Sequence, residues 1–317
     1  MLKRDARVQD VAAQHCLGGP TLPKILYIQM RSFSPIGMAQ EAAPDYSKLT
    51  IVLPTYNEVE NISNIVPELF RLYPGVHVTV VDDSSSDGTG EAVEGLRATH
   101  QNLKLIERHI SKKGLTASVM EGIASVQTEY FVAMDADFQH PPASVADLYG
   151  ELMKGADVAI GVRRDMGTLP LYRRAASWGA HKLAASYLWC RRQPRSRDLM
   201  SGFFGGRTEI AKNILRNKGD KFEPKGFKVL FDLLKFVPRD SKVAEASFTF
   251  GDRVSGNSKL NSDIILSLLK QCGSLGKVAS FTVEFFFINK AGRVVGLLIL
   301  VAIIAIALMM GGQPAKP

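Results

Sequence analysis

The sequence contains little cysteine, and the cysteines that it has are scattered. Among 317 residues there are three, Cys16, Cys190 and Cys272, with no paired spacing between them. A disulfide framework needs paired cysteines, and a zinc site needs cysteine or histidine pairs a few residues apart. Neither is therefore indicated, and a reducing compartment fits the sequence best.

Two common nucleotide-binding motifs are lacking as well. The first predicted strand, residues 49–53, leads into Pro54-Thr55-Tyr56-Asn57-Glu58, whereas a dinucleotide-binding fold would have Gly-x-Gly-x-x-Gly there. No Gly-x-x-x-x-Gly-Lys-Ser/Thr phosphate loop occurs anywhere in the sequence. Dehydrogenases of the Rossmann type and P-loop nucleotide hydrolases are thus disfavoured. No Ser/His/Asp arrangement stands out either.

The composition is that of a globular protein with an excess of positive charge. Hydrophobic residues make up 46% of the chain, which is ample for one sizeable domain and argues against a disordered or collagen-like chain. The formal net charge is +8. This charge favours anionic partners, a class that includes nucleic acid, membrane surfaces and phosphorylated small molecules.

A regular alternation of apolar runs and helical patterns begins at Leu49. The apolar runs predict strands at residues 49–53, 76–81, 103–106, 130–134 and 157–162. Predicted helices follow at residue 62 onward, after Ser84–Thr89 with its N-cap candidates, at 115–126 and at 141–154. We therefore expect an α/β fold with a doubly wound, mostly parallel sheet flanked by helices. Parallel strands end at a common edge, so residues 54–58, 82–83 and 135–139 should lie side by side.

The end of the fourth predicted strand carries two acidic residues. Asp135 and Asp137 are two positions apart, so in an extended chain both side chains point to the same side. Their oxygen atoms, with one more from Gln139, suit Mg²⁺ or Mn²⁺, and Mg²⁺ needs only one or two carboxylates when substrate phosphates supply further ligands. The same pattern also forms turns and helix N-caps, and His140 would either be a third ligand or cap the strand end.

Five segments together resemble a known enzyme family. The first three, in this order and spacing, resemble the family 2 inverting glycosyltransferases of GT-A fold: residues 54–58 (PTYNE), 81–89 (VDDSSSDGT) and 135–137 (DAD). The resemblance narrows to the dolichyl-phosphate mannose synthases with residues 200–204 (MSGFF) and 248–260 (FTFGDRVSGNSKL). It covers about residues 49–272 and departs from the family at Asn257, where Glu is common, and at Met200, where Val or Thr is usual.

The resemblance implies substrates and a role for each matching residue. The donor would be GDP-mannose and the acceptor dolichyl or another polyprenyl phosphate. The guanine end of the donor would lie among Pro54, Tyr56, Glu58, Val81, Asp82 and Asp83. Ribose and diphosphate would lie beside Asp135 and Ala136, and the divalent cation would be held by Asp135, Asp137 and Gln139. The phosphates of donor and acceptor would be bound by Arg163, Arg253 and Lys259, which form the catalytic set together with Asp137.

The chemistry of sugar transfer explains these residue types. Departure of GDP leaves negative charge on its phosphates, which a divalent cation stabilises. The acceptor is a phosphate monoester with a second pKa of roughly 6, so most of it is already a dianion at neutral pH and needs no general base. Arg163, Arg253 and Lys259 would offset the repulsion between the two anions. Gly251 and Gly256 on either side of Arg253 indicate a loop that closes over the bound donor.

The two ends of the chain differ from the catalytic domain that we expect at residues 48–260. Residues 1–47 have no sustained periodicity, so we expect an extension with little fixed structure. Residues 294–310 form an unbroken apolar run of 17 residues, which predicts a transmembrane helix at 291–312. The residues between, 261–290, are expected to lie amphipathically at the membrane interface.

Basic residues around the apolar run determine the predicted orientation. Lys277, Lys290 and Arg293 precede the run and Lys316 follows it, so the catalytic domain should face the cytosol. We expect the endoplasmic reticulum membrane in a eukaryote and the cytoplasmic face of the plasma membrane otherwise. The sequence leaves open whether a further set of arginines contacts phosphates or lipid headgroups or is simply solvated: Arg173, Arg174, Arg191, Arg192, Arg195 and Arg197.

We therefore expect a membrane-anchored mannosyltransferase that makes polyprenyl-phosphate mannose from GDP-mannose with Mg²⁺ or Mn²⁺. Its expected partners are the two substrates and the lipid bilayer, and nucleic acid is not expected among them. One alternative is an enzyme that transfers glucose from UDP-glucose to the same lipid. Another is an inactive, membrane-anchored subunit that binds nucleotide. The sequence leaves open whether accessory membrane subunits take part.

Overall fold

The computed structural model describes residues 44–109, 114–164, 171–223, 229–249, 251 and 271, with backbone alone at 171–177, 179 and 180. All of them lie in the compact unit that begins at Pro44. The N-terminal extension up to residue 43, the interfacial segment apart from Gln271, and the predicted helix at 291–312 lie outside these residues. None of the helices in the described residues combines the length and the apolar character that a membrane span needs.

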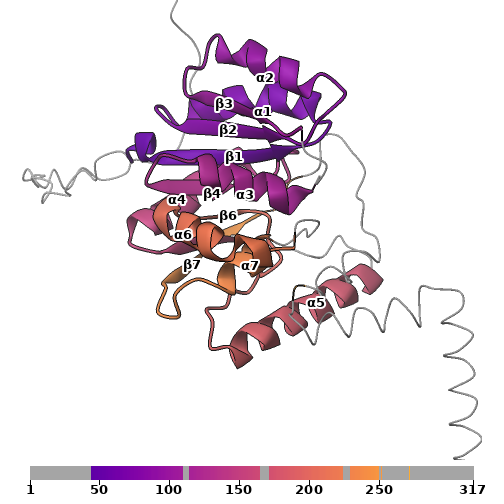
Figure 1. The fold of residues 1–317 in the computed structure, drawn as a ribbon, viewed down its shortest axis with the longest axis vertical. Helices are drawn as coiled ribbons and strands as arrows, with labels where there is room; N and C mark the ends of the chain where they lie inside the picture. The colour runs from indigo at the N-terminus through magenta and orange to yellow at the C-terminus, as the bar shows by residue number, and fades with distance from the viewer. Residues whose placement is uncertain are drawn as a thin grey trace, which may run out of the picture. The chain divides into compact units, whose positions relative to one another are not determined.

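The core of the fold is a seven-stranded sheet with the order β3-β2-β1-β4-β6-β5-β7 (Figure 1). The strands are β1 (Leu49–Thr55), β2 (His77–Asp82), β3 (Leu103–Glu107), β4 (Tyr130–Ala133), β5 (Val158–Arg163), β6 (Phe204–Arg207) and β7 (Val243–Phe248). Neighbouring strands are parallel except around β6, which runs antiparallel to both β4 and β5. The prediction of a mostly parallel α/β sheet is therefore confirmed, with each predicted strand present within two residues of its expected ends.

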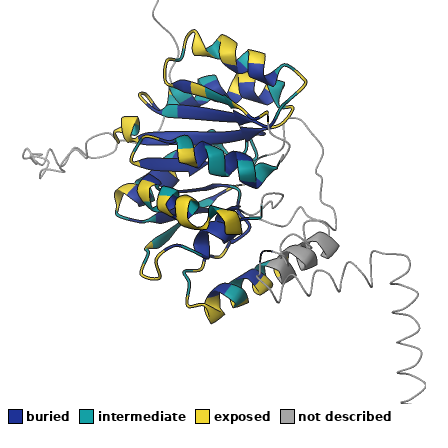
Figure 2. Cartoon of the chain, viewed as in Figure 1, coloured by how far each residue is buried: buried dark blue, intermediate teal, exposed yellow. Residues whose placement is uncertain are grey.

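Helices cover both faces of the sheet. The α-helices are α1 (Val59–Leu72), α2 (Thr89–Arg97), α3 (Leu115–Ser125), α4 (Val145–Met153), α5 (Leu171–Cys190), α6 (Thr208–Lys218) and α7 (Val229–Leu234), and the short 3₁₀ helices are η1 (Tyr46–Lys48), η2 (Pro142–Ser144) and η3 (Gly219–Lys221). Ile51 and Leu53 of β1 belong to one core cluster with residues of α1, α2 and α4, whereas Val52 belongs to a second with residues of α3, α6 and α7. Successive strand residues point to opposite faces, so a strand covered on both sides must be apolar throughout. Figure 2 shows these buried strands between helices whose exposed residues face outward.

The register of the strands brings three loops to one edge. Pro54 and Thr55 at the end of β1 pair with Val81 and Asp82 at the end of β2. On the other side of β1, Val52 pairs with Ala133, the last residue of β4. The loops that follow β1, β2 and β4 therefore begin side by side, which confirms the prediction from the parallel topology.

The start of α2 differs from the expected one. Ser84–Thr89 were predicted to provide an N-cap side chain, but the N-cap residue is Gly88, in a left-handed conformation with φ 91° and without a capping side chain. The preceding Asp87 instead accepts a hydrogen bond from the backbone N–H of Thr89 (3.1 Å) and one from that of Val59 (3.1 Å). A single carboxylate therefore serves the N-termini of both α1 and α2, which joins the loops after β1 and β2.

Candidate active site

A cavity of about 480 Å³ opens where the loops after β1, β2 and β4 meet. Its lining comes from segments far apart in the sequence: Pro54, Thr55, Tyr56, Glu58, Asp83, Gly114, Leu115, Ser118, Asp135, Ala136 and Asp137. Seven of the predicted site residues are among them. A polar cavity at the carboxyl edge of an α/β sheet is the usual place for a ligand.

The three loops that form the cavity each contain a strained residue. Asn57, Ser84 and Phe138 follow β1, β2 and β4, and their φ angles of 57°, 59° and 62° are uncommon for residues other than glycine. Side-chain hydrogen bonds hold the first loop against the second, since Asn57 receives the N–H of Ser86 (3.0 Å) and donates its own N–H to Ser85 Oγ (2.8 Å). Strain of this kind often accompanies a functional site, where the surrounding contacts maintain it.

The two acidic residues after β2 have different environments. Asp82 is buried and accepts hydrogen bonds from Thr55 Oγ1 (3.1 Å) and from the backbone N–H of Ser85 (2.8 Å). Asp83 lines the cavity, and its Oδ2 accepts a hydrogen bond from the backbone N–H of Gly114 (2.8 Å). Among the described residues, neither Asp82 nor Val81 belongs to the cavity lining. The structure thus distinguishes a buried acid with a structural role from one that lines the cavity, a distinction that the sequence did not predict.

A buried arginine that the sequence analysis did not identify supports Asp83. Arg108 directly follows β3 and is only 4% exposed. Its Nη1 donates to Asp83 Oδ1 and to Ser118 Oγ (3.2 Å), and its Nε donates to Glu121 Oε2 (2.9 Å). The signal that identifies Arg108 in hindsight is its position, because a residue that follows a parallel strand lies at the same edge as the other strand ends.

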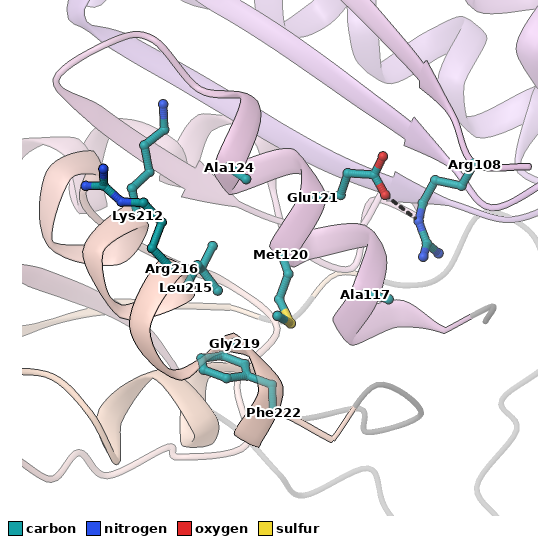
Figure 3. Close-up of a pocket in the computed structure, with 10 residues that line it drawn as sticks. All are labelled: Arg108, Ala117, Met120, Glu121, Ala124, Lys212, Leu215, Arg216, Gly219 and Phe222. Carbon is teal, nitrogen blue, oxygen red and sulfur yellow. Dashed lines mark hydrogen bonds and ion pairs between the residues drawn. The ribbon is translucent and has the colours of Figure 1, made fainter. Parts of the chain in front are cut away.

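Arg108 also lines a second, larger cavity of about 740 Å³ between α3 and α6 (Figure 3). The side chains of Met120, Leu215 and Phe222 converge on this cavity, with Lys212 and Arg216 at one end and the Arg108–Glu121 pair at the other (Figure 3). Arg108 therefore connects the two cavities, since it lines the second one and its partners Asp83 and Ser118 line the first.

The loop after β4 presents Asp135 and Asp137 to the cavity. The Asp135 side chain is 41% exposed, whereas Asp137 is 7% exposed and accepts the backbone N–H of Gln139 at Oδ1 (3.1 Å). His140 closes the loop, because its Nδ1 accepts the backbone N–H of Asp135 (3.0 Å). Burial lowers the pKa of His140, although Asp135 and Asp137 oppose this shift, and a neutral imidazole is what an accepting Nδ1 requires. Of the two predicted roles, the strand-end cap is the one observed.

The segment before β6 packs directly against this loop. The ring of Phe203 stacks on His140 with 5.2 Å between centroids. At Gly202, a Cβ atom would lie 3.2 Å from Asp135 Oδ2, so the backbone there passes close beside the carboxylate. Residues 200–204 were predicted to be a family motif, without a role in the site. The structure shows that Gly202 lies beside Asp135 and that Phe203 packs on His140.

Gln139 holds the start of the segment that carries the predicted loop cations. Its backbone oxygen accepts the N–H of Gly251 (3.0 Å), and a Cβ at Gly251 would lie 2.6 Å from the backbone oxygen of Phe138. Gln139 is not among the described residues that line the cavity. Arg253 and Lys259, which follow Gly251 in the sequence, lie outside the described residues.

Arg163, the last residue of β5, pairs with an acid outside the predicted set. Its Nε donates to Asp198 Oδ2 at 3.0 Å, and the side chains are 22% and 11% exposed. Within the described part of the chain, Arg163 is not part of the cavity lining. Arg163 nevertheless pairs in the sheet with Phe248, whose ring lies 5.6 Å from that of His140 between centroids. The pair therefore lies beside the loop after β4.

The acidic residues fit a cation that shares its ligands with a substrate. The described residues contain no group of three or more histidine, cysteine or acidic side chains arranged for a metal ion. Asp135 and Asp137, however, line the same cavity. Mg²⁺ commonly binds proteins through one or two carboxylates and takes further ligands from phosphates and water. The pair suits a cation that arrives with a diphosphate, and the assignment of the ligands remains a prediction.

Comparison of sequences identifies relatives of the chain. Residues 50–215 match the model of the family described as glycosyl transferase family 2. A dolichol-phosphate mannosyltransferase from Pyrococcus furiosus is 34% identical over 252 residues, which cover 74% of this chain and 68% of that protein. One from Saccharomyces cerevisiae is 33% identical over 71% of this chain and 86% of its own. A polyprenol monophosphomannose synthase from Mycolicibacterium smegmatis is 32% identical over 67% and 80%, respectively.

Comparison of structures agrees on the fold. The structure of glucosyl-3-phosphoglycerate synthase from Mycobacterium tuberculosis in complex with Mn²⁺, UDP-glucose and phosphoglyceric acid matches with a TM-score of 0.52. The match covers 72% of this chain and 82% of that one at 21% identity, so the likeness concerns the fold. It confirms the predicted α/β fold of GT-A type, here with a mixed sheet. The chain belongs to glycosyl transferase family 2, in its group of dolichol-phosphate mannosyltransferases.

Proposed function

We propose that this chain transfers mannose from GDP-mannose to dolichyl phosphate or another polyprenyl phosphate, with Mg²⁺ or Mn²⁺. The names of its relatives support the sugar and the lipid acceptor. The observation that carries the proposal is the convergence of Asp83, Asp135 and Asp137 on one cavity. An acceptor for the N–H groups of a base and two carboxylates for a cation are what recognition of a nucleoside-diphosphate sugar requires.

The base end of the donor is assigned to Asp83 and Tyr56. Guanine has adjacent N–H donors at N1 and N2, whereas uracil has one at N3, so a fixed carboxylate favours guanine by an additional hydrogen bond. Arg108 and Gly114 hold the two oxygens of Asp83, and each oxygen has a further lone pair to offer. Tyr56 is 48% exposed on the cavity wall, where its ring is placed to stack on a base.

The diphosphate end of the donor is assigned to the loop after β4. Asp135, Asp137 and Gln139 would hold the divalent cation, which neutralises charge on the departing diphosphate. The Mn²⁺ and nucleotide sugar in the similarly folded synthase from Mycobacterium tuberculosis support this assignment. Two hydrogen bonds hold the backbone of this loop: His140 Nδ1 accepts the N–H of Asp135, and the N–H of Gly251 donates to the backbone oxygen of Gln139.

The acceptor end is assigned to Arg163 with Arg253 and Lys259. A phosphate monoester dianion attacks without a general base, so cations that reduce the repulsion between the two substrates are the remaining requirement. The strand neighbour of Arg163, Phe248, contacts His140 in the loop that carries Asp135 and Asp137. Its guanidinium can bind two phosphate oxygens at once, which fixes the direction of attack.

A lipid acceptor requires the enzyme to work at a membrane. We propose that residues 291–312 span the bilayer, that residues 261–290 lie at its interface and that the catalytic domain faces the cytosol. In a eukaryote the membrane would be that of the endoplasmic reticulum, and otherwise the plasma membrane. The apolar run at 294–310 and the basic residues before it support this arrangement.

Replacement of Asp137 tests the proposed role of the carboxylates. Asp137→Ala should reduce mannose transfer to dolichyl phosphate by about a hundredfold or more, because a ligand of the cation is lost. Asp147→Ala is the matched control, since Asp147 is an exposed carboxylate on α4. Transfer is measured as labelled mannose in a lipid extract of membranes that carry each variant. Unchanged transfer by Asp137→Ala, with melting temperatures equal to the parent's, would exclude the metal role.

A further inference from the structure

The segment between α5 and β6 is tied to the edge strand β7 by a single carboxylate. Glu245 of β7 accepts hydrogen bonds from Ser196 Oγ (2.9 Å) and from the backbone N–H of Arg197 (2.7 Å) at Oε1. Its Oε2 accepts from Arg197 Nε (2.5 Å). Burial alone would raise the pKa of Glu245, but these hydrogen bonds from Arg197 and Ser196 lower it, so the carboxylate is ionised at neutral pH. The segment is thereby fixed to the sheet.

Within this fixed segment, Asp198 is held at both its backbone and its side chain. Its backbone N–H donates to Ser196 Oγ (3.2 Å), and its Oδ1 accepts the backbone N–H of Met200 (3.1 Å). The remaining oxygen, Oδ2, accepts from Arg163 Nε. The carboxylate therefore reaches Arg163 from a support that is already in place, which lowers the entropic cost of the ion pair.

The atom through which Arg163 is bound determines what Asp198 does. Nε lies on the side of the planar guanidinium, and a bond there fixes the plane of the group and the direction of its two terminal nitrogens. Arg163 itself ends β5, where its backbone is paired with Phe248 of β7. The ring of Phe248 lies 5.6 Å from that of His140, so strand, segment and ion pair together define one orientation of the guanidinium beside the loop that carries Asp135 and Asp137.

We propose that Asp198 is a positioning residue that orients the guanidinium of Arg163 toward the phosphate of the lipid acceptor. The inference rests on the proposed function, in which Arg163 binds that phosphate. Asp198 does not touch substrate in this account. Its effect on the reaction passes through Arg163 and should therefore fall on acceptor affinity, with the KM for GDP-mannose left almost unchanged.

The test compares this ion pair with a second Asp–Arg pair at the opposite end of β5, just before the strand begins. Asp157 Oδ1 lies 3.4 Å from Arg207 Nε, at the end of β6, which runs antiparallel to β5. Asp157→Asn thus breaks a pair of the same residue types away from the cavity, although this pair is more exposed, at 36% and 24% against 22% and 11%. Full-length Asp198→Asn, Asp157→Asn, Arg163→Lys and the Asp198→Asn/Arg163→Lys double variant are assayed in detergent with GDP-mannose and dolichyl phosphate.

We expect Asp198→Asn to raise the KM for dolichyl phosphate about tenfold or more, which is the usual effect of a hydrogen bond to a charged group. The KM for GDP-mannose should change less than about twofold, and Asp157→Asn should leave both constants at the parent values. In the Arg163→Lys background, Asp198→Asn should raise the acceptor KM no further, because the group that it positions is gone.

Other results would overturn the inference. If Asp198→Asn lowered the melting temperature but had the same acceptor KM as Asp157→Asn, Asp198 would contribute to stability and not to the position of Arg163. If the increase of the acceptor KM in the double variant equalled the product of the increases in Asp198→Asn and Arg163→Lys, Asp198 would act independently of Arg163. Parent enzyme that forms no mannosyl lipid would instead overturn the proposed function, and this inference with it.

Discussion

Removal of Arg108 is the perturbation whose size the structure predicts best. The guanidinium is 4% exposed and pairs with Asp83, whose side chain is 10% exposed, and with Glu121, whose side chain is 40% exposed. Arg108→Met keeps most of the apolar length of the side chain but leaves the buried carboxylate without its cation. Loss of one partner of a buried ion pair costs about 3–5 kcal/mol. We expect roughly 3 kcal/mol, the lower end, because Gly114 still donates to Asp83.

Glu121→Gln provides the scale for this loss. It removes the charge of the more exposed partner, and solvent screening limits the effect of such pairs to about 0–1 kcal/mol. For a domain of this size, 1 kcal/mol corresponds to roughly 2–4 °C in melting temperature, so Arg108→Met should melt roughly 6–12 °C below the parent. Glu121→Gln should stay within roughly 4 °C.

Donor affinity gives a second readout on the same variants. Because Asp83 lines the cavity, a carboxylate released from Arg108 should bind the base less well, and the KM for GDP-mannose should rise about tenfold. In an Asp83→Asn background, Arg108→Met should cost much less stability, since an amide needs no counter-ion. The reasoning would be refuted if Arg108→Met lowered the melting temperature by no more than Glu121→Gln does. It would also be refuted if Arg108→Met cost the same stability in the Asp83→Asn background as in the parent.

Three further outcomes follow from single residues. Gly251→Ala should lower both stability and mannose transfer, because its Cβ would lie 2.6 Å from the Phe138 backbone oxygen, and thermal melts with transfer assays check this. Gly202→Ala should reduce transfer with little loss of melting temperature, because its Cβ would lie 3.2 Å from the mobile end of the Asp135 side chain. Burial alone would raise the pKa of Asp87, but hydrogen bonds from Thr89 and from the N–H groups that begin α1 and α2 lower it below 3.8. The stability that the ionised carboxylate provides is present above pH 3.8 and is lost as the pH falls further. Because the position is exposed, Asp87→Asn should lower the free energy of unfolding by only about 0.5–1 kcal/mol at pH 7 and by almost nothing near pH 2, as measured by urea unfolding.

The edge of the sheet could be predicted from the sequence because a single rule determines it. Apolar runs separated by helical patterns specify parallel strands, and parallel strands bring their carboxyl ends together. The rule therefore predicts that Glu58, Asp83 and Asp135 lie at the same edge of the sheet, and no contact between them has to be known. The rule applies to every strand end, including that of β3 before Arg108, but a lone arginine belongs to no motif and was therefore not predicted.

The remaining site residues depend on contacts that no local pattern encodes. Which of Asp82 and Asp83 faces the ligand depends on the register of β2 against Thr55 of β1, since successive residues of a strand point to opposite sides. Strand β6 is short and contains two consecutive glycines, so neither length nor periodicity marked it. Asp198 and Gly202 reach the site because that strand inserts between β4 and β5.

The most direct test of the account uses two donors in competition. Membranes that carry the full-length chain are incubated with dolichyl phosphate, Mg²⁺, and equal concentrations of GDP-mannose and UDP-glucose that carry different labels, and the lipid fraction is then extracted. The account predicts that the mannose label enters the lipid in large excess and that Asp83→Asn lowers its incorporation. Label from UDP-glucose alone, or none from either donor, would contradict it.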